Sequence, residues 1–255
     1  MPNLVSASPR HVGQQADAMV AFRRTAGAIS LPLGFLLQAA SNCVYAVITT
    51  ESGLSDGNAV DGLELYGRYP NHMVAASVLA MTGVLFIVAG LPTALRVLHP
   101  FAPRLAFIAV VPMVGGYVSY FGVVTSNFAT LAIAEYAASH PEADLTGVWD
   151  SSSPAALIPF FLLFVLGNLG GTLLLGIAVV LASRRSKELP WYAGALIMAW
   201  PVGHIANLIG GGEWFAVAGG VLEVVGLSIL AIRAMQRSAI DRFTQELVPG
   251  QTIAI

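Results

Sequence analysis

The chain has 255 residues, of which 56% are hydrophobic and 10% are charged, and its formal net charge is −2. Soluble domains usually carry about 25% charged residues, so this composition excludes an ordinary soluble domain and indicates a protein embedded in lipid. The near-neutral charge argues against nucleic acid as a partner. The single cysteine, Cys43, excludes a disulfide within the chain.

The first span follows a mixed, polar segment. We expect residues 1–24 to form a cytoplasmic tail and residues 25–49 to form the first membrane helix. Arg23 and Arg24, followed by apolar residues and the small residues 39–41, have features of a cleaved signal peptide. Apolar residues resume after this point, however, and make the run long enough to cross a bilayer. The sequence therefore predicts a retained first helix.

Five further apolar runs follow, separated by stretches rich in glycine, proline or polar residues. We expect an outer loop at 51–70 and a polar cytoplasmic tail at 236–255. Residues 127–138 have helical patterning, and we expect them to lie along the membrane surface between the third and fourth spans. The predicted second to sixth spans are 71–98, 104–125, 154–183, 190–209 and 214–235.

The basic residues indicate how the chain is oriented. Cytoplasmic loops of membrane proteins retain most of the arginine and lysine. If the N-terminus is inside, only Arg68 falls in an outer segment, so this orientation fits the rule. The basic residues then placed inside, beside span ends, are Arg23, Arg24, Arg96, Arg104, Arg184, Arg185, Lys187, Arg233 and Arg237. The sequence thus predicts an all-α, multi-pass bundle of six transmembrane helices with both termini cytoplasmic. We expect it in the cell membrane, which is the inner membrane if the source is bacterial.

Proline and glycine recur at similar places in two odd-numbered spans. The first span has Pro32-x-Gly34, and the fifth has Pro201-x-Gly203. With all hairpins starting on the same side, this pattern favours a weak parallel repeat of three helical hairpins.

Polar side chains inside the predicted spans are costly in lipid, and seven of them could line a common pocket. Glu223 is the only carboxylate deep in an apolar run. An ionised carboxylate there costs about 3 kcal/mol or more, so we expect it to be protonated or hydrogen-bonded. Spacings of three or four residues place Gln38 with Asn42, and His204 with Asn207, on shared helix faces. The predicted ligand-binding pocket, in the outer half of the bundle, is lined by Glu223, His204, Asn207, Gln38, Asn42, Asn168 and Tyr117.

Motifs for catalysis or cofactor binding are missing from the sequence. It has no phosphate-binding glycine–lysine motif, no His-Glu-x-x-His and no Gly-x-Ser-x-Gly. A haem bound by His204 would need His72 as its second ligand, and the depths of these two residues match poorly. We therefore expect no cofactor, no bound metal and no catalytic residues.

These observations favour a protein that binds or transports a small lipophilic or cationic molecule, or a lipid, in the pocket around Glu223. Two alternatives stay open. One is an accessory or scaffold subunit without its own ligand, working as a homo-oligomer or with a partner membrane subunit. The other is an intramembrane enzyme that uses Glu223 and His204 on a lipid-like substrate; with no catalytic signature, we do not expect an enzyme. In each case membrane lipids are the surrounding partners.

Overall fold

The computed structural model describes residues 9–55, 58–140, 143 and 158–247, and within these ranges the chain is helical and contains no strand. Six of its helices are long and apolar enough to cross a membrane, which confirms the predicted all-α membrane bundle. The protein is therefore a multi-pass integral membrane protein. The six segments are Ala18–Ser52, Pro70–Leu98, Pro103–Ser139, Ile158–Arg185, Trp191–Gly210 and Trp214–Arg237.

A π-helical turn interrupts the fourth span, and another ends the fifth. In the fourth span, η1 lies between α6 and α7, and in the fifth span η2 follows α8. The elements are α1 (Pro9–Ser52), α2 (Ala59–Arg68), α3 (Pro70–Leu98), α4 (Pro103–Ser139), α6 (Ile158–Val165), η1 (Leu166–Gly170), α7 (Gly171–Arg185), α8 (Trp191–Ala206), η2 (Asn207–Gly211) and α9 (Trp214–Leu247).

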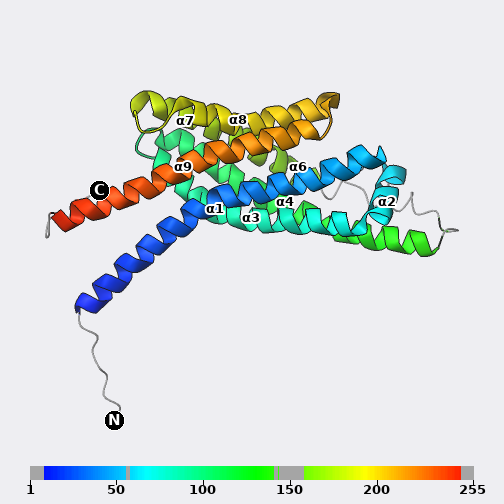
Figure 1. Cartoon of the computed structure of the whole chain (residues 1–255), viewed down its shortest axis with the longest axis horizontal. Coiled ribbons are helices and arrows are strands. Elements are labelled where there is room, and N and C mark those ends of the chain that lie inside the picture. Colours follow the sequence, from blue (N-terminus) through cyan, green and yellow to red (C-terminus); the bar gives the residue numbers. More distant parts are fainter. Residues whose placement is uncertain (1–8, 56–57, 141–142, 144–157, 248–255) are drawn as a thin grey trace, which may run out of the picture.

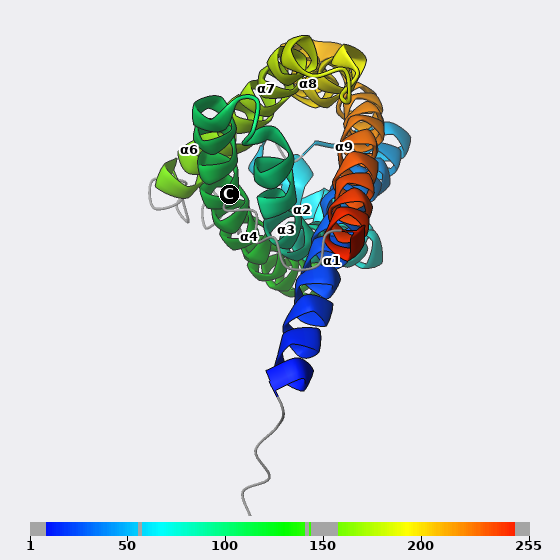
Figure 2. The same cartoon turned by 90° about the vertical axis from the view of Figure 1, so that its left-hand side faces the viewer.

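The spans form a closed ring. Each packs against the spans before and after it in the sequence, and α9 packs back against α1 (Figure 2). The hydrophobic core runs along the centre of this ring and contains residues from every span. A site lined by residues from several spans must therefore lie inside the ring.

Pairs of glycines bring neighbouring spans into close contact. A Cβ atom on Gly34 of α1 would lie 2.8 Å from the carbonyl oxygen of Gly83 on α3. One on Gly176 of α7 would lie 2.7 Å from the carbonyl oxygen of Gly194 on α8. Such contacts suit a lipid environment, where helices associate through close packing rather than through the hydrophobic effect. Similar pairs are Gly116 with Gly167 and Gly203 with Gly219.

The structure differs from the sequence prediction on α4. We expected the third span to end near Thr125 and residues 127–138 to form a separate segment along the membrane surface, whereas one helix runs through both. The helix continues to Ser139, because no proline or glycine interrupts the chain after Gly122. Asn127 donates a hydrogen bond to Ser77 on α3, 3.1 Å away, which holds this extension against the bundle.

Two segments that we expected to be loop or tail are helical. Within the predicted outer loop, α2 starts at the cap Asn58, whose side chain accepts a hydrogen bond from the backbone of Asp61 at 2.9 Å. Leu65 and Tyr66 of α2 are buried against the ends of α1, α3 and α4. At the other end of the bundle, α1 begins at Pro9, well before the predicted span.

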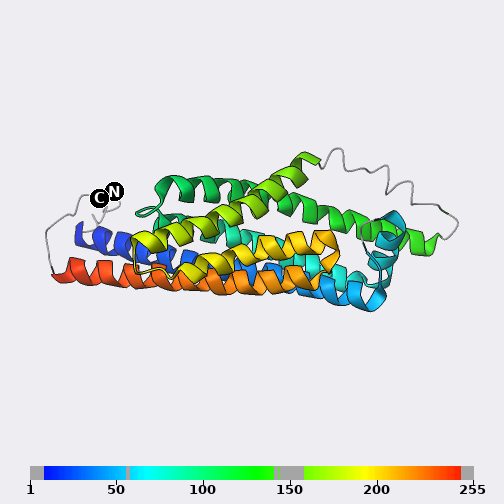
Figure 3. The same cartoon turned by 90° about the horizontal axis from the view of Figure 1, so that it is seen from above.

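The start of α1 and the end of α9 lie at the same end of the bundle (Figures 1 and 3). We call this the Arg237 end, and the opposite end, which carries α2 and the η2–α9 turn, the Glu213 end. The sidedness of these ends in the membrane and the parallel hairpin repeat stay predictions.

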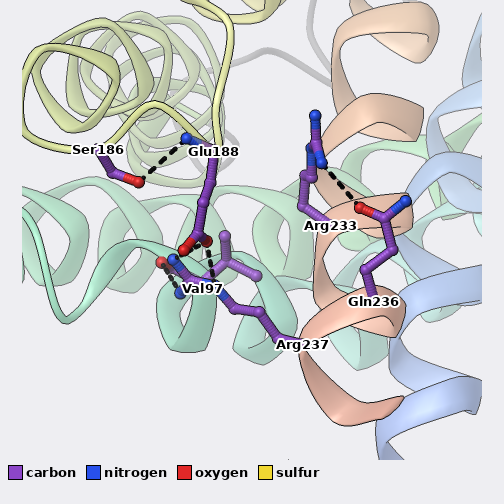
Figure 4. Close-up of polar contacts among 6 residues, drawn as sticks. All are labelled: Val97, Ser186, Glu188, Arg233, Gln236 and Arg237. Atoms are coloured by element: carbon purple, nitrogen blue, oxygen red, sulfur yellow. Dashed lines mark hydrogen bonds and ion pairs between the residues drawn. The ribbon is translucent and has the colours of Figure 1, made fainter. Parts of the chain in front are cut away.

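A polar network closes the Arg237 end (Figure 4). The Nε and Nη2 atoms of Arg237 donate to one carboxylate oxygen of Glu188, at 2.8 and 2.6 Å. Its Nη1 donates to the carbonyl oxygen of Val97 at 3.2 Å, and its guanidinium lies 4.8 Å from the Phe101 ring centroid. Arg185 donates to the carbonyl oxygen of Phe101. The network therefore ties α9 to α3, to the α3–α4 turn and to the α7–α8 connection.

Candidate functional site

Glu223 lies inside the ring. It is nine residues along α9 from Trp214, about 14 Å from the Glu213 end of that helix. Its side chain is only 1% exposed, and its Oε1 atom has no hydrogen-bond partner among the described residues. Buried polar atoms are nearly always satisfied. The carboxyl group therefore needs a hydrogen-bond partner that the described protein atoms do not supply.

The unpaired carboxyl group lines an inner cavity of about 100 Å³. This volume exceeds what a single water molecule needs. Six of the seven residues predicted from the sequence line it: Gln38, Asn42, Tyr117, Asn168, His204 and Glu223. They come from α1, α4, η1, α8 and α9, so the fold brings together polar residues from five elements. Whether these residues bind a ligand stays a prediction.

Hydrogen bonds fix two of the lining side chains. Gln38 donates from Nε2 to the carbonyl oxygen of Ala80 on α3, at 2.7 Å. Tyr117 donates from its hydroxyl to Oδ1 of Asn168, at 2.8 Å. The Tyr117 hydroxyl and one of the two N–H groups of Gln38 are therefore bound to protein acceptors, and the amide oxygen of Gln38 and the phenol oxygen of Tyr117 remain as acceptors.

Asn168 is positioned by a local irregularity of the fourth span. It lies in the π-helical turn η1, which widens the helix by one residue, and only 2% of its surface is exposed. Next to it, Gly167 packs on Gly116 of α4, so the two helix backbones meet beside the cavity. Single π-helical turns often occur at functional sites.

His204 lies on the wall of the inner cavity towards the Glu213 end. Its ring stacks on Trp200, with centroids 4.5 Å apart and an interplanar angle of 24°. Its Nδ1 atom is buried and has no hydrogen-bond partner among the residues that the structure describes. The cavity wall therefore contains two buried polar atoms without a partner among the described residues, His204 Nδ1 and Glu223 Oε1.

Asn207 is the one predicted residue that does not line the inner cavity. It lines an outer cavity of about 280 Å³ and a further one of about 240 Å³, and donates a hydrogen bond to Glu213 at 2.9 Å. The larger outer cavity shares Asn42, Tyr120 and His204 with the inner cavity. The cavities therefore adjoin one another from the Glu213 end to Glu223.

On the other side of Glu223 the bundle is filled with apolar side chains. Leu227 follows Glu223 by one turn of α9 and is fully buried, as is Ile197 on α8. Leu91, Met113 and Leu175 are also fully buried and belong to the same core. This apolar layer separates the inner cavity from the Arg237 end.

The sequence interpretation missed the aromatic part of the wall. Phe35, Tyr120, Phe164 and Trp200 line the inner cavity with the polar residues. Spacing could have found them, because each lies three or four residues from a polar lining residue of the same span. The corresponding pairs are Phe35 with Gln38, Tyr120 with Tyr117, Phe164 with Asn168 and Trp200 with His204.

The described residues include no group of three or more His, Cys, Asp or Glu side chains able to hold a metal ion. Comparison of the chain with protein-family models, with curated proteins and with solved structures finds no match. The functional assignment therefore rests on the geometry of the cavities.

Proposed function

We propose that the protein binds a small molecule in the inner cavity and carries it across the membrane. The observation that carries the proposal is the carboxyl group of Glu223, which is buried in the cavity wall with one oxygen unpaired. A ligand that donates a hydrogen bond to this oxygen would remove the cost of leaving it unsatisfied, which is about 1–3 kcal/mol or more.

The purely structural alternative explains the carboxyl group less well. An acid that only joins helices would have its oxygens bonded to a neighbouring helix, as Tyr117 is bonded to Asn168. Glu223 instead leaves one oxygen beside an open volume. Ionisable residues that face an interior cavity of a membrane protein commonly mark a substrate or ion pathway.

The direction of entry follows from where the cavities lie and from the basic residues. The adjoining cavities begin at the Glu213 end of the bundle. The arginines cluster at the Arg237 end, which we therefore propose to be the cytoplasmic end. Cavities on one side of a site and packed side chains on the other are the arrangement expected of a carrier in its outward-facing state. Opening of the Arg237 end would then release the ligand inside.

Native mass spectrometry of gently extracted protein tests the binding step. We expect wild-type protein to carry a bound small molecule and Glu223→Gln to lose it, because the amide removes the charge while keeping the shape. Glu64→Gln is the matched control, because Glu64 is exposed on α2. Bare protein of one oligomeric state in all three samples would contradict the proposal and support the scaffold alternative.

A further inference from the structure

The composition of the cavity walls indicates which class of ligand the protein binds. We infer that the inner cavity takes a small alkylammonium cation, a protonated primary or secondary amine. This inference rests on the proposed function and adds the chemistry of the ligand. Charge, hydrogen-bonding capacity, aromatic walls and size each support it.

Carboxyl groups, which a cationic ligand would hold in their ionised form, line the cavities. Glu213 lines both outer cavities and Glu223 lines the inner one, while no lysine or arginine lines any of the three within the described chain. A low-dielectric passage lined by charges of one sign concentrates ions of the opposite sign. An anionic ligand would find no cationic side chain to neutralise it. The ligand of this pathway is therefore a cation.

The inner cavity offers several hydrogen-bond acceptors. The hydroxyl hydrogen of Tyr117 is donated to Asn168 and one of the two amide hydrogens of Gln38 is donated to Ala80, so each residue keeps an oxygen lone pair as acceptor. Glu223 adds the unpaired Oε1. A ligand matching these acceptors must donate several hydrogen bonds, as an ammonium group with two or three N–H bonds does. Quaternary ammonium ions have no N–H donor and match the site less well.

Aromatic rings supply the rest of the wall. Phe35, Tyr120, Phe164 and Trp200 line the inner cavity beside the polar groups. Ring faces attract organic cations, by about 2 kcal/mol or more where water is excluded, and also accommodate alkyl groups. The cavity of about 100 Å³ limits the ligand to a few non-hydrogen atoms.

A metal cation fits the site less well than an organic one. Hard cations such as Mg²⁺ and Ca²⁺ take six or more oxygen ligands, usually with several carboxylates. The inner cavity has one carboxylate, and aromatic rings occupy much of its wall. The mixture of one acid, neutral acceptors and rings is the pattern expected for an ammonium group with an attached alkyl chain.

Trp200 provides a fluorescent reporter inside the site. In a full-length variant carrying Trp149→Phe, Trp191→Phe and Trp214→Phe, Trp200 is the remaining tryptophan. The variant, reconstituted in lipid nanodiscs, is titrated with propylammonium, 1-propanol and propionate, which match in length but differ in charge. Acrylamide, a neutral quencher, reports whether small solutes reach Trp200. Introducing Glu223→Gln, or Glu64→Gln as control, completes the set.

We expect propylammonium to change Trp200 fluorescence in a saturable way and to bind at least about tenfold more tightly than 1-propanol, because a charged hydrogen bond is worth about 1.5–3 kcal/mol. Glu223→Gln should weaken this binding about tenfold, and Glu64→Gln should not. Equal binding of 1-propanol, or preferential binding of propionate, would overturn the cationic class while leaving a ligand site at Glu223. No binding of any probe, with Trp200 shielded from acrylamide, would overturn both the class and the proposed function.

Discussion

At the scale of single residues, the site depends on a few side chains held at fixed positions. The bond from Tyr117 to Asn168 joins α4 to the neighbouring η1, and that from Gln38 to Ala80 joins α1 to the neighbouring α3. Both leave acceptor atoms beside Glu223. These bonds therefore serve structure and recognition together.

Removing the hydroxyl of Tyr117 should affect both roles. Tyr117→Phe leaves Oδ1 of the buried Asn168 without its donor, so we expect a loss of about 1 kcal/mol in the free energy of unfolding. Binding of propylammonium should weaken as well. Thermal unfolding in detergent and the Trp200 titration measure the two effects.

Tyr120→Phe is the control for this change. Tyr120 stacks on Phe164 at 4.4 Å, and within the described residues its hydroxyl makes no hydrogen bond, so its loss should change stability little. Equal melting temperatures for the two variants would contradict the structural role given to the Tyr117 bond.

At the scale of elements, glycine contacts set the distance between neighbouring helices. Gly34→Ala would place a methyl group 2.5 Å from the backbone nitrogen of Ile87 and force α1 away from α3. We expect a loss of about 1–3 kcal/mol in the free energy of unfolding, the usual range for overpacking. Thermal unfolding in detergent measures it.

Gly122→Ala is the matched control, because a Cβ atom at Gly122 of α4 would meet nothing within 4 Å. Alanine favours helix over glycine by up to about 1 kcal/mol, so this variant should be unchanged or more stable. If Gly34→Ala melts at the same temperature as Gly122→Ala, the close approach of α1 and α3 is wrong.

The elements also show how far sequence reasoning reaches. Long apolar runs predicted the six spans, because the thickness of the hydrocarbon core dictates the length of an uninterrupted helix. The end of α4 and the existence of α2 were missed. Outside the hydrocarbon core, helix ends depend on caps such as Asn58 and on tertiary contacts, which apolar length does not report.

The candidate site was predictable to the extent that membrane depth and helical spacing define it. Spacings of three or four residues paired Gln38 with Asn42 and His204 with Asn207, and three of these four residues line the inner cavity. Spacing alone did not separate Asn207, which lies at the outer cavities. That distinction depends on the rotation of each helix about its axis and on the π-helical turns, which appear only when the helices pack.

At the scale of the whole molecule, the two ends of the bundle differ. The outer cavities lie at the Glu213 end. The network around Arg237 and a layer of apolar side chains close the other end. Exposed ion pairs contribute little singly. Arg237, however, also bonds to Val97 and lies over Phe101, so it contacts three separate parts of the chain.

Breaking this network should loosen the closed end. We expect Arg237→Gln to speed amide hydrogen exchange several-fold in residues 186–189 and 98–102, because the side chain no longer ties these connections to α9. Arg233→Gln is the control, since Arg233 bonds only to Gln236 in its own helix within the described chain (Figure 4). Identical exchange in both variants would show that the network does not hold the end closed.

The most direct test of the account asks whether water-soluble molecules reach the inner cavity from outside the cell. With Cys43 replaced by serine, a new cysteine is introduced at Asn42, which lines both the inner and the larger outer cavity. Val78→Cys is the control, because Val78 is exposed on the outer surface of α3 at about 12 Å from its Pro70 end. Intact cells are then treated with a membrane-impermeant thiol reagent.

We expect rapid labelling of Asn42→Cys from outside, slowed by propylammonium, and little labelling of Val78→Cys, which faces lipid. Labelling of Asn42→Cys no faster than that of Val78→Cys, or only when the reagent is applied to the cytoplasmic face, would contradict an outward-open site at Glu223.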